Sequence, residues 1–380
     1  MLLRLYYATS SPPPRLFRPR YFAAVDYVSG LIHYIIDTPK RQWWVRLLAM
    51  AVSWCVYLGS FITDTIPASL DAPPRVDVND KKRLPVIVFS HGLAGNRNLY
   101  AGLLTSLASQ GYLVAAIEHR DGSASCAARV RSTEAKVAVT YELYIHTDGN
   151  HAWRRKQIAR RVEELSAAIE VFSAASEGRG VPRNMFPTSR FDSSVLDGVV
   201  DVSRLVAMGH SFGGATVMTA MGKNAAIKRV VLLDPWTEPL GGAVAVRAAS
   251  IPTLVLNSHN WSRDQDLHSL YQDSTAAWLE AEVADTTHQD FSDLFLRMPL
   301  ATSMFTKRVK SRVNIHKYYD FNLALLHLFF ELTQVKHTEE SGGGGGSGGG
   351  LAVALHEGAV ELVRDYRGDL EIRMRSSASG

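Results

Sequence analysis

The stretch GHSFGG at residues 209–214 constrains this chain more than any other. It follows the apolar run 204–208 and precedes the run 215–221, whose composition indicates the start of a helix. A Gly-x-Ser-x-Gly pattern between a strand and a helix is typical of a sharp, strained turn that lifts a serine hydroxyl out of a sheet. Bulky residues two positions either side of the serine would clash in such a turn. The plainer alternative is a glycine-rich turn without chemistry, and we take Ser211 as a candidate nucleophile.

The composition is that of an ordinary globular protein. The 380 residues are 46% hydrophobic and 21% charged, enough for one large domain or two small ones. Lysine and arginine number 41 and aspartate and glutamate 37, so the formal net charge is +4. Because no dense basic tract is interleaved with aromatic residues, we expect no nucleic-acid partner. Cys55 and Cys126 lie in dissimilar contexts without metal-ligand spacing, which favours two unpaired thiols.

Apolar runs with the length of buried strands recur along the chain and alternate with helical patterns. Strand, helix and strand over 84–117 indicate a βαβ unit, which requires parallel strands. The sequence therefore predicts an α/β fold with a mostly parallel central sheet flanked by helices. The expected strands are 2–7, 84–90, 112–117, 204–208, 230–233 and 251–257, and the expected helices are 99–110, 131–172, 267–279 and 322–332.

The domain organisation follows from composition. Residues 1–335 are predicted to form one catalytic domain. Residues 341–350 are almost entirely glycine and serine, which predicts a flexible linker. Residues 351–380 then form a C-terminal tail, with a short amphipathic helix over 351–366.

A segment near the N-terminus allows three interpretations. Residues 47–62 are apolar and uncharged, and a basic and aromatic flank at 41–46 precedes them. The run is shorter than the roughly 20 residues that span a bilayer. The apolar helical insertion at 21–66 is therefore a buried or lid-like helix, a helix that docks at a membrane interface, or a membrane span.

Acyl transfer by a serine needs a base, an acid that orients the base, and donors for the oxyanion. Asp234 ends the strand expected after the Ser211 turn, and His288 lies in a polar stretch beyond the following strand. Serine, acid and histidine is the chain order of α/β-hydrolases, so we predict that fold with these three residues as a catalytic triad. In that fold the oxyanion donors would be the backbone N–H groups of Leu93 and Phe212.

Further residues surround these candidates. We expect His91, Trp236 and Gln289 to line the substrate pocket. His91 and His210 are expected to pack or hydrogen-bond rather than to act as bases. The histidines are scattered, with no His-x-x-x-His or Cys-x-x-Cys pair, so we expect neither a metal nor a cofactor.

Five motifs carry a specific resemblance. They are FSHGL at 89–93, EHRD with SAS at 118–125, GHSFGGATV at 209–217, L-D-x-W at 233–236 and HQDFSD at 288–293. Together they resemble the platelet-activating factor acetylhydrolase family, the plasma and intracellular type II enzymes, over about residues 2–330.

The resemblance implies a calcium-independent hydrolase that removes short or oxidised sn-2 acyl chains from phospholipids. It implies Ser211 as nucleophile, Asp234 as orienting acid and His288 as base. It also implies a phospholipid substrate at a membrane or lipoprotein interface, which gives residues 43–62 a role as a lid or a membrane-contact element. No protein partner is implied.

Two departures from the family pattern bear on these expectations. The chain lacks the strand expected before residues 2–7, where a signal peptide or myristoylation site would lie. As the sequence stands we expect a cytoplasmic protein with peripheral membrane association, and a secreted one if a missing N-terminus carries a signal peptide. Pro235 replaces a residue that is commonly small, and we expect it to stiffen the turn without removing the acid.

Two other functions stay open. A general carboxylesterase or lipase would use the same triad with a different pocket. A non-catalytic lipid- or protein-binding homologue would have a broken triad, whereas this sequence has all three residues.

Overall fold

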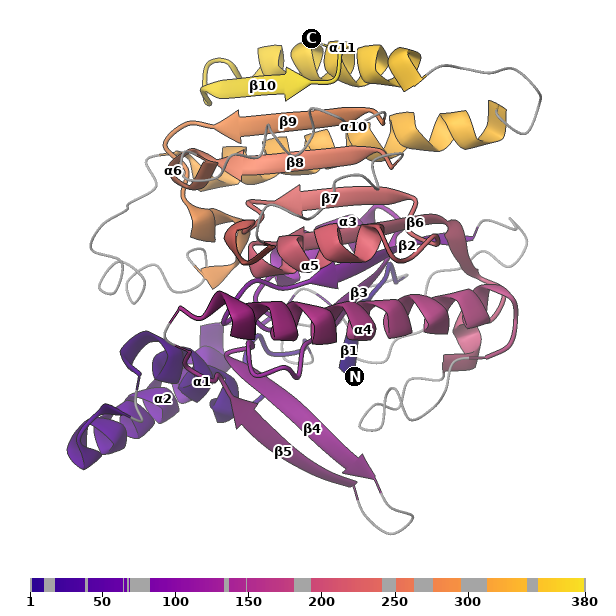
Figure 1. Ribbon diagram of the computed structural model, residues 1–380. Coiled ribbons are helices and arrows are strands. Elements are labelled where there is room, and N and C mark those ends of the chain that lie inside the picture. The colour runs from indigo at the N-terminus through magenta and orange to yellow at the C-terminus, as the bar shows by residue number, and fades with distance from the viewer. Residues whose placement is uncertain are drawn as a thin grey trace. The chain divides into compact units, whose positions relative to one another are not determined.

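The computed structural model of the protein describes residues 2–9, 18–37, 40–63, 65–66, 68, 83–132, 137–147, 149–180, 193–240, 251–262, 276–294, 313–339 and 348–378. The chain divides into two compact units, Met1–Val202 and Ser203–Gly380. Each unit contains parallel strands with helices packed against them, as the predicted fold class requires (Figure 1).

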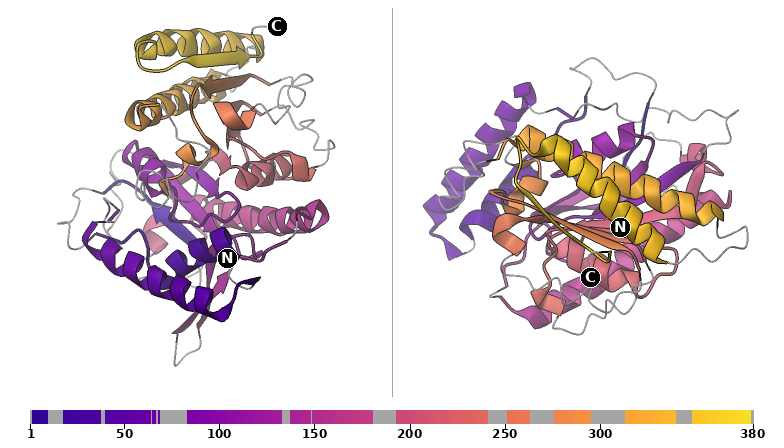
Figure 2. Two further views of the ribbon diagram at one scale, coloured as in Figure 1. Left: turned by 90° about the vertical axis from the view of Figure 1, so that its left-hand side faces the viewer. Right: turned by 90° about the horizontal axis from the view of Figure 1, so that it is seen from above.

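The first unit is built on strands β1 (Leu2–Tyr6), β2 (Leu84–Ser90) and β3 (Leu113–Glu118). β2 and β3 are parallel and joined through α3 (Ala101–Ser109), whereas β1 pairs antiparallel with β3. Every residue of β3 is buried, because α3 and α4 (His151–Ser176) cover opposite faces of these strands (Figure 2). The predicted βαβ unit and N-terminal strand are confirmed.

The described residues between 131 and 143 do not form the predicted helix. They belong to an antiparallel hairpin of β4 (Cys126–Ser132) and β5 (Val137–Leu143), and α4 begins only at His151. The prediction of a helix over 131–172 was therefore wrong for its first part. Charged residues are dense there, but in β4 they alternate with apolar ones at the period of two that belongs to a strand.

Two helices follow β1, namely α1 (Val25–Ile36) and α2 (Trp43–Thr63). α1 buries Tyr27, Val28 and Leu31, whereas α2 exposes most of its large apolar side chains, so the interpretation of α2 as a buried helix was wrong. In the described part of the chain, no helix is both long and apolar enough to cross a membrane.

The second unit contains four parallel strands. Its elements are β6 (Val200–His210, which begins in the first unit), α5 (Phe212–Met221), β7 (Arg229–Leu233), β8 (Thr253–Ser258), β9 (Trp278–Val283), α10 (Ile315–Glu339), α11 (Gly348–Tyr366) and β10 (Ile372–Ser376). In spatial order the parallel strands run β6, β7, β8 and β9, and β10 is added antiparallel to β9. In Figure 1, α5 lies in front of these strands and α10 lies behind β8 and β9.

The C-terminal residues belong to this second unit. The helix predicted over 351–366 is present as α11, which buries Leu355 and Ala359 completely. It begins at Gly348, within the predicted linker, whose residues 341–347 lie outside the described part of the chain. Trp278 and Leu279 begin β9 rather than ending a helix, and residues 267–275 of that predicted helix also lie outside the described residues.

Four short helices complete the described elements. The four are η4 (Ser193–Leu196), η5 (Glu238–Leu240), α6 (His259–Ser262) and η7 (His288–Phe291). Of these, α6 follows β8 and η7 follows β9, and both contribute to the site.

Candidate active site

Ser211 stands at the sharp turn between β6 and α5. Its backbone has φ 55° and ψ −117°, a region that residues with a side chain rarely adopt. Two backbone hydrogen bonds stabilise this strained conformation: Ser211 N donates to Leu233 O at 2.9 Å, and Trp236 N donates to Ser211 O at 3.0 Å. The predicted nucleophile therefore has the strained geometry that the motif requires.

Glycines make this turn possible through close approach of backbone to backbone. A Cβ added to Gly209 would overlap the carbonyl group of Gly213. A Cβ on Gly214 would come within 2.8 Å of the Pro235 Cβ, so α5 can begin beside the turn after β7 only without a side chain there. Gly209 and Gly214 are thus explained by packing around Ser211.

Asp234 follows β7 and is completely buried. Its carboxylate accepts hydrogen bonds from Ser258 N at 2.6 Å, from the Ser258 hydroxyl and from His288 Nδ1 at 3.0 Å. Burial raises the pKa of Asp234 well above its usual value, and the two bonds from Ser258 act in the opposite direction. Three donors to one carboxyl group suit its ionised form, which is the form that can orient an imidazole.

His288 begins η7, whose start is fixed by two hydrogen bonds between Thr287 and Asp290. Asp290 N donates to Thr287 O at 3.0 Å, and Asp290 Oδ2 accepts from Thr287 N at 2.7 Å. Burial lowers the pKa of His288 to about 3, so the imidazole is neutral at neutral pH. With Nδ1–H directed to Asp234, the second ring nitrogen, Nε2, is the one that can accept a proton.

The neighbours of the three candidates join them into one site. Ser211 N donates a hydrogen bond to the carbonyl oxygen of Leu233, which precedes Asp234, and Ser211 O accepts one from the N–H of Trp236. His210 Nε2 donates to His288 O at 3.0 Å, and the two rings lie 4.6 Å apart. The structure therefore gathers Ser211, Asp234 and His288 at the carboxyl ends of β6, β7 and β9, where α/β sheets place their ligands.

The remaining site residues that the sequence predicts in the second unit are near neighbours of the three triad candidates. The Phe212 ring is completely buried and lies 5.7 Å from the half-buried Trp236 ring. Gln289 is half-buried beside His288 in η7. His210 is buried and hydrogen-bonded, as expected of a packing residue, and burial lowers its pKa well below the usual value.

Leu93 and His91 lie in the first unit, in the turn after β2. Leu93 is half-buried, and its neighbour Ala94 has φ 55° and donates to Ser123 O at 2.7 Å. His91 is completely buried and its Nδ1 donates to Gly92 O at 2.8 Å. We therefore see His91 as a group that shapes this turn, rather than one open to a pocket.

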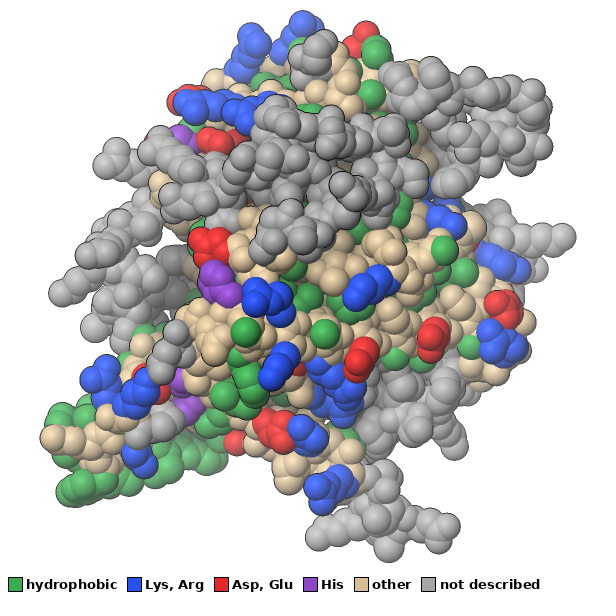
Figure 3. All heavy atoms as spheres, in the orientation of Figure 1, with side chains coloured by type: hydrophobic (Ala, Val, Ile, Leu, Met, Phe, Trp, Pro, Cys, Tyr) green, Lys and Arg blue, Asp and Glu red, His purple; other side chains and the backbone are tan. Residues whose placement is uncertain are grey.

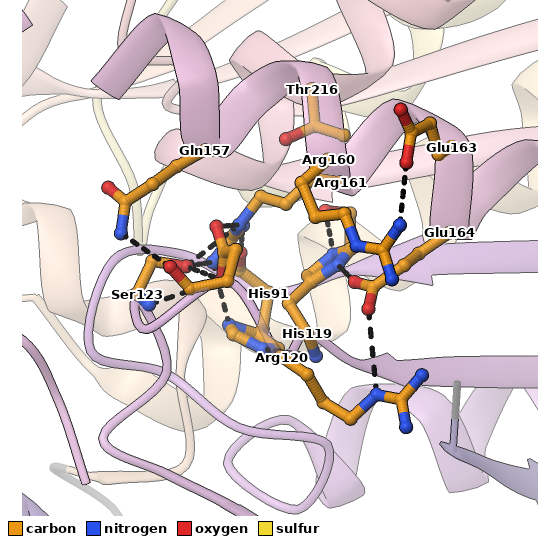
Figure 4. Close-up of polar contacts among 12 residues, drawn as sticks. His91, His119, Arg120, Ser123, Gln157, Arg160, Arg161, Glu163, Glu164 and Thr216 are labelled. Carbon is orange, nitrogen blue, oxygen red and sulfur yellow. Dashed lines mark hydrogen bonds and ion pairs between the residues drawn. The ribbon is translucent and has the colours of Figure 1, made fainter. Parts of the chain in front are cut away.

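A buried arginine fixes the same turn (Figure 4). Arg161 on α4 is completely buried and donates to His91 O at 2.6 Å and to Ser123 Oγ at 2.6 Å, while its Nε lies 3.1 Å from Asp121 Oδ2. Beside it, His119 Nδ1 donates to Glu164 Oε2 at 2.8 Å. A buried charge that is fully paired in this way gives the turn a defined conformation.

Sequence reasoning missed two residues of the site. Ser258 ends β8 and supplies two donors to Asp234, and Trp261 in α6 stacks on His288 with ring centroids 3.8 Å apart. Neither belongs to a motif. Their position at the end of a buried strand and in the residues that follow it was the available signal, because that edge of the sheet carries the site.

Residues 1–336 match the model of the family described as platelet-activating factor acetylhydrolase, isoform II. The chain belongs to this family.

Individual platelet-activating factor acetylhydrolases are also similar to this chain. The platelet-activating factor acetylhydrolase of Canis lupus familiaris is 30% identical over 339 residues, covering 85% of this chain and 70% of that protein. The one of Gallus gallus is 33% identical over 217 residues, covering 54% of this chain and 49% of that protein. The matched stretch is thus about half of the chicken relative's length.

Among solved structures, a ferulic acid esterase from Streptomyces cinnamoneus is similar to this member of the family. The TM-score is 0.52 at 16% identity, over 87% of this chain and 82% of the esterase chain. At this identity the likeness concerns the fold alone, and it agrees with the predicted α/β-hydrolase fold.

Proposed function

We propose that this chain is a calcium-independent serine hydrolase that removes short or oxidised sn-2 acyl chains, such as acetyl, from phospholipids including platelet-activating factor. The products are a lysophospholipid and a carboxylate. The observation that carries the proposal is the 3.0 Å hydrogen bond between His288 Nδ1 and the buried Asp234, beside the strained Ser211, in a member of this family.

In the first half of the reaction, Ser211 Oγ attacks the sn-2 carbonyl carbon while His288 Nε2 takes the hydroxyl proton. Asp234 holds the imidazole by its Nδ1–H and stabilises the imidazolium that forms. The imidazolium then gives the proton to the glycerol oxygen as the bond to the acyl carbon breaks. The lysophospholipid leaves, and the acyl group remains on Ser211.

In the second half, water attacks the acyl carbon and His288 takes one proton from it. The Ser211 oxygen leaves with that proton, and the carboxylic acid ionises to a carboxylate in solution. The enzyme returns to its starting state without a metal or a redox step.

Both halves pass through a tetrahedral oxyanion that needs backbone donors. Phe212 N–H, the first of α5, is one candidate, since it lies next to the nucleophile at a helix N-terminus. Leu93 N–H is the second candidate, and the buried Arg161 supports it by fixing the turn after β2. We assign the substrate pocket to Trp236 and Gln289 from their places beside Ser211 and His288.

The surface of α2 fits the interface at which such a substrate resides. Trp43 is 72% exposed and Leu48 57%, and further large apolar side chains of α2 are about half exposed, an unusual density for a solvent-facing helix. These apolar side chains form the green surface at the lower left of Figure 3, with basic residues beside it. We propose that α2 lies on a lipid surface with this face immersed.

The test compares an sn-2 acetyl phospholipid with its long-chain counterpart in the presence of a calcium chelator. Fast, Ser211-dependent release of acetate, with little release of the long chain, is the expected result. Equal rates would replace the proposal by a general carboxylesterase or lipase. No turnover of either substrate by a folded protein would favour a non-catalytic binding protein.

A further inference from the structure

The imidazole of His288 is stacked against an indole. The ring centroids of Trp261 and His288 lie 3.8 Å apart and the planes are inclined by 21°, which is a close parallel contact. Asp234 fixes one edge of the same imidazole through Nδ1, and the His210 ring lies 4.6 Å away. The face of the base is therefore covered by aromatic surface.

Trp261 also contacts the turn that carries the acid. Its Nε1–H donates to Pro235 O at 3.3 Å, and Pro235 directly follows Asp234. One side chain thus touches both the base and the segment that positions the acid. A tryptophan that only filled space would not need this pair of contacts.

The short helix α6 holds Trp261 in place. It follows Ser258 directly, and Ser258 is bonded to Asp234 by its backbone and its side chain. At its start, His259 N donates to Thr286 Oγ1 at 3.2 Å and His259 Nδ1 lies 2.8 Å from Glu282 Oε1. These anchors come from the end of β9 and the residues after it, so α6 is tied to the segment that leads to His288.

We propose that Trp261 is a positioning residue for the catalytic base, whose indole keeps water from the His288 imidazole and holds the ring in line with Asp234. The inference rests on the proposed function of Ser211, Asp234 and His288. It goes further in giving a role to a residue outside the triad, which acts through His288.

An indole stacked on the imidazole affects the protonation of the base, because it shields the ring from water. The low pKa of His288 has burial as its cause, and the indole is part of what buries it. Among the described residues, the titratable groups near the ring are Asp234 and His210. Around Asp234 lie Glu282, which is paired with His259, and Tyr318. Since substitution of Trp261 leaves all of these groups in place, a shift in the acid limb of the activity profile would report that the indole no longer shields His288 from water.

The experiment measures kcat, KM and the pH profile of kcat/KM for wild type, Trp261→Ala, Trp261→Leu and Trp261→Phe. The substrate is p-nitrophenyl acetate, which needs no lipid surface, and Ser211→Ala gives the background. Trp153→Ala, a substitution of a partly exposed tryptophan on α4, is the matched control. A wild type that cleaves this ester but no phospholipid would refute the proposed substrate and still leave the Trp261 inference testable.

We expect kcat of Trp261→Ala to fall about 10- to 100-fold with little change in KM, because the base is misplaced after substrate binds. The acid limb should move up toward the ordinary histidine value, and Trp261→Phe should restore both properties. Should Trp261→Ala fail to fold, Trp261→Leu, which keeps apolar volume without an aromatic face, should show the same changes. Wild-type kcat with an unmoved acid limb in the folded variants would overturn the proposal, as would Trp261→Phe behaving like Trp261→Ala.

Discussion

Ser258 donates both its backbone N–H and its hydroxyl to the carboxylate of Asp234. Two donors from the end of β8 therefore hold the acid that orients His288. Burial alone would favour the protonated carboxyl group, and Ser258 opposes this. The ionised state of the acid thus depends on a residue outside the triad.

Ser258→Ala should lower kcat by about 10- to 100-fold, because the loss of a hydrogen bond to a charged group costs about 1.5–3 kcal/mol and raises the pKa of Asp234. Steady-state kinetics on p-nitrophenyl acetate would check this. Ser109→Ala, which alters an exposed serine at the end of α3, is the control. Kinetics equal to wild type would mean that Ser258 is not needed to keep the acid ionised.

The pH dependence follows from the lowered pKa of His288. The base works when neutral, so activity is lost as the pH falls through the apparent pKa of the Asp234–His288 pair. Burial places the histidine's pKa at about 3, well below its usual value, and the acid limb of kcat/KM should therefore lie below pH 6.5. An ordinary histidine would leave about a tenth of the activity one pH unit below that value. We expect more than half to remain there, and an acid limb at or above 6.5 would contradict the burial that the structure shows.

The surroundings of two glycines, one beside the Ser211 turn and one in α2, predict opposite effects of alanine substitution on stability. Gly214→Ala brings a Cβ within 2.8 Å of Pro235 and should lower the free energy of unfolding by about 1–3 kcal/mol. Gly59→Ala in α2 meets no atom within 4 Å and should raise it by up to about 1 kcal/mol through helix propensity. Urea denaturation measures both. Equal stability of wild type and Gly214→Ala would show that α5 and the turn after β7 are not in contact as described.

The exposed face of α2 predicts membrane binding. Trp44, Leu47 and Leu48 are each about half exposed and share one face of the helix. Replacing all three by serine should weaken binding to phosphatidylcholine vesicles at least about tenfold, since each buried apolar side chain contributes about 1.5–3 kcal/mol. Sedimentation with vesicles measures this, and hydrolysis of p-nitrophenyl acetate should be unchanged. Val353→Ser, on the exposed side of α11, is the control, and unaltered binding of the triple variant would remove α2 from the interface.

The residues that a motif carries were predictable from the sequence. The turn around Ser211, the strand ending at Asp234 and the loop histidine His288 each follow from local pattern and chain order. Ser258 and Trp261 could not be predicted in this way, because the pairing of β7, β8 and β9 brings them to the site.

The hairpin of β4 and β5 was missed for a different reason. Dense charge favoured a helix over 131–143, whereas the alternation of arginine with apolar residues in β4 was the stronger physical signal. Likewise β10 becomes a strand only by pairing with β9 across about 90 residues of chain, which no local pattern reveals.

The central claim is that Ser211 is the nucleophile, and covalent labelling tests it most directly. A fluorophosphonate probe should form one adduct, which peptide mapping by mass spectrometry places on Ser211, with complete loss of esterase activity. Ser211→Ala should remain folded and unlabelled, and Asp234→Asn should label far more slowly because the His288 tautomer is no longer held. An adduct on another serine, or full activity in Ser211→Ala, would contradict the account.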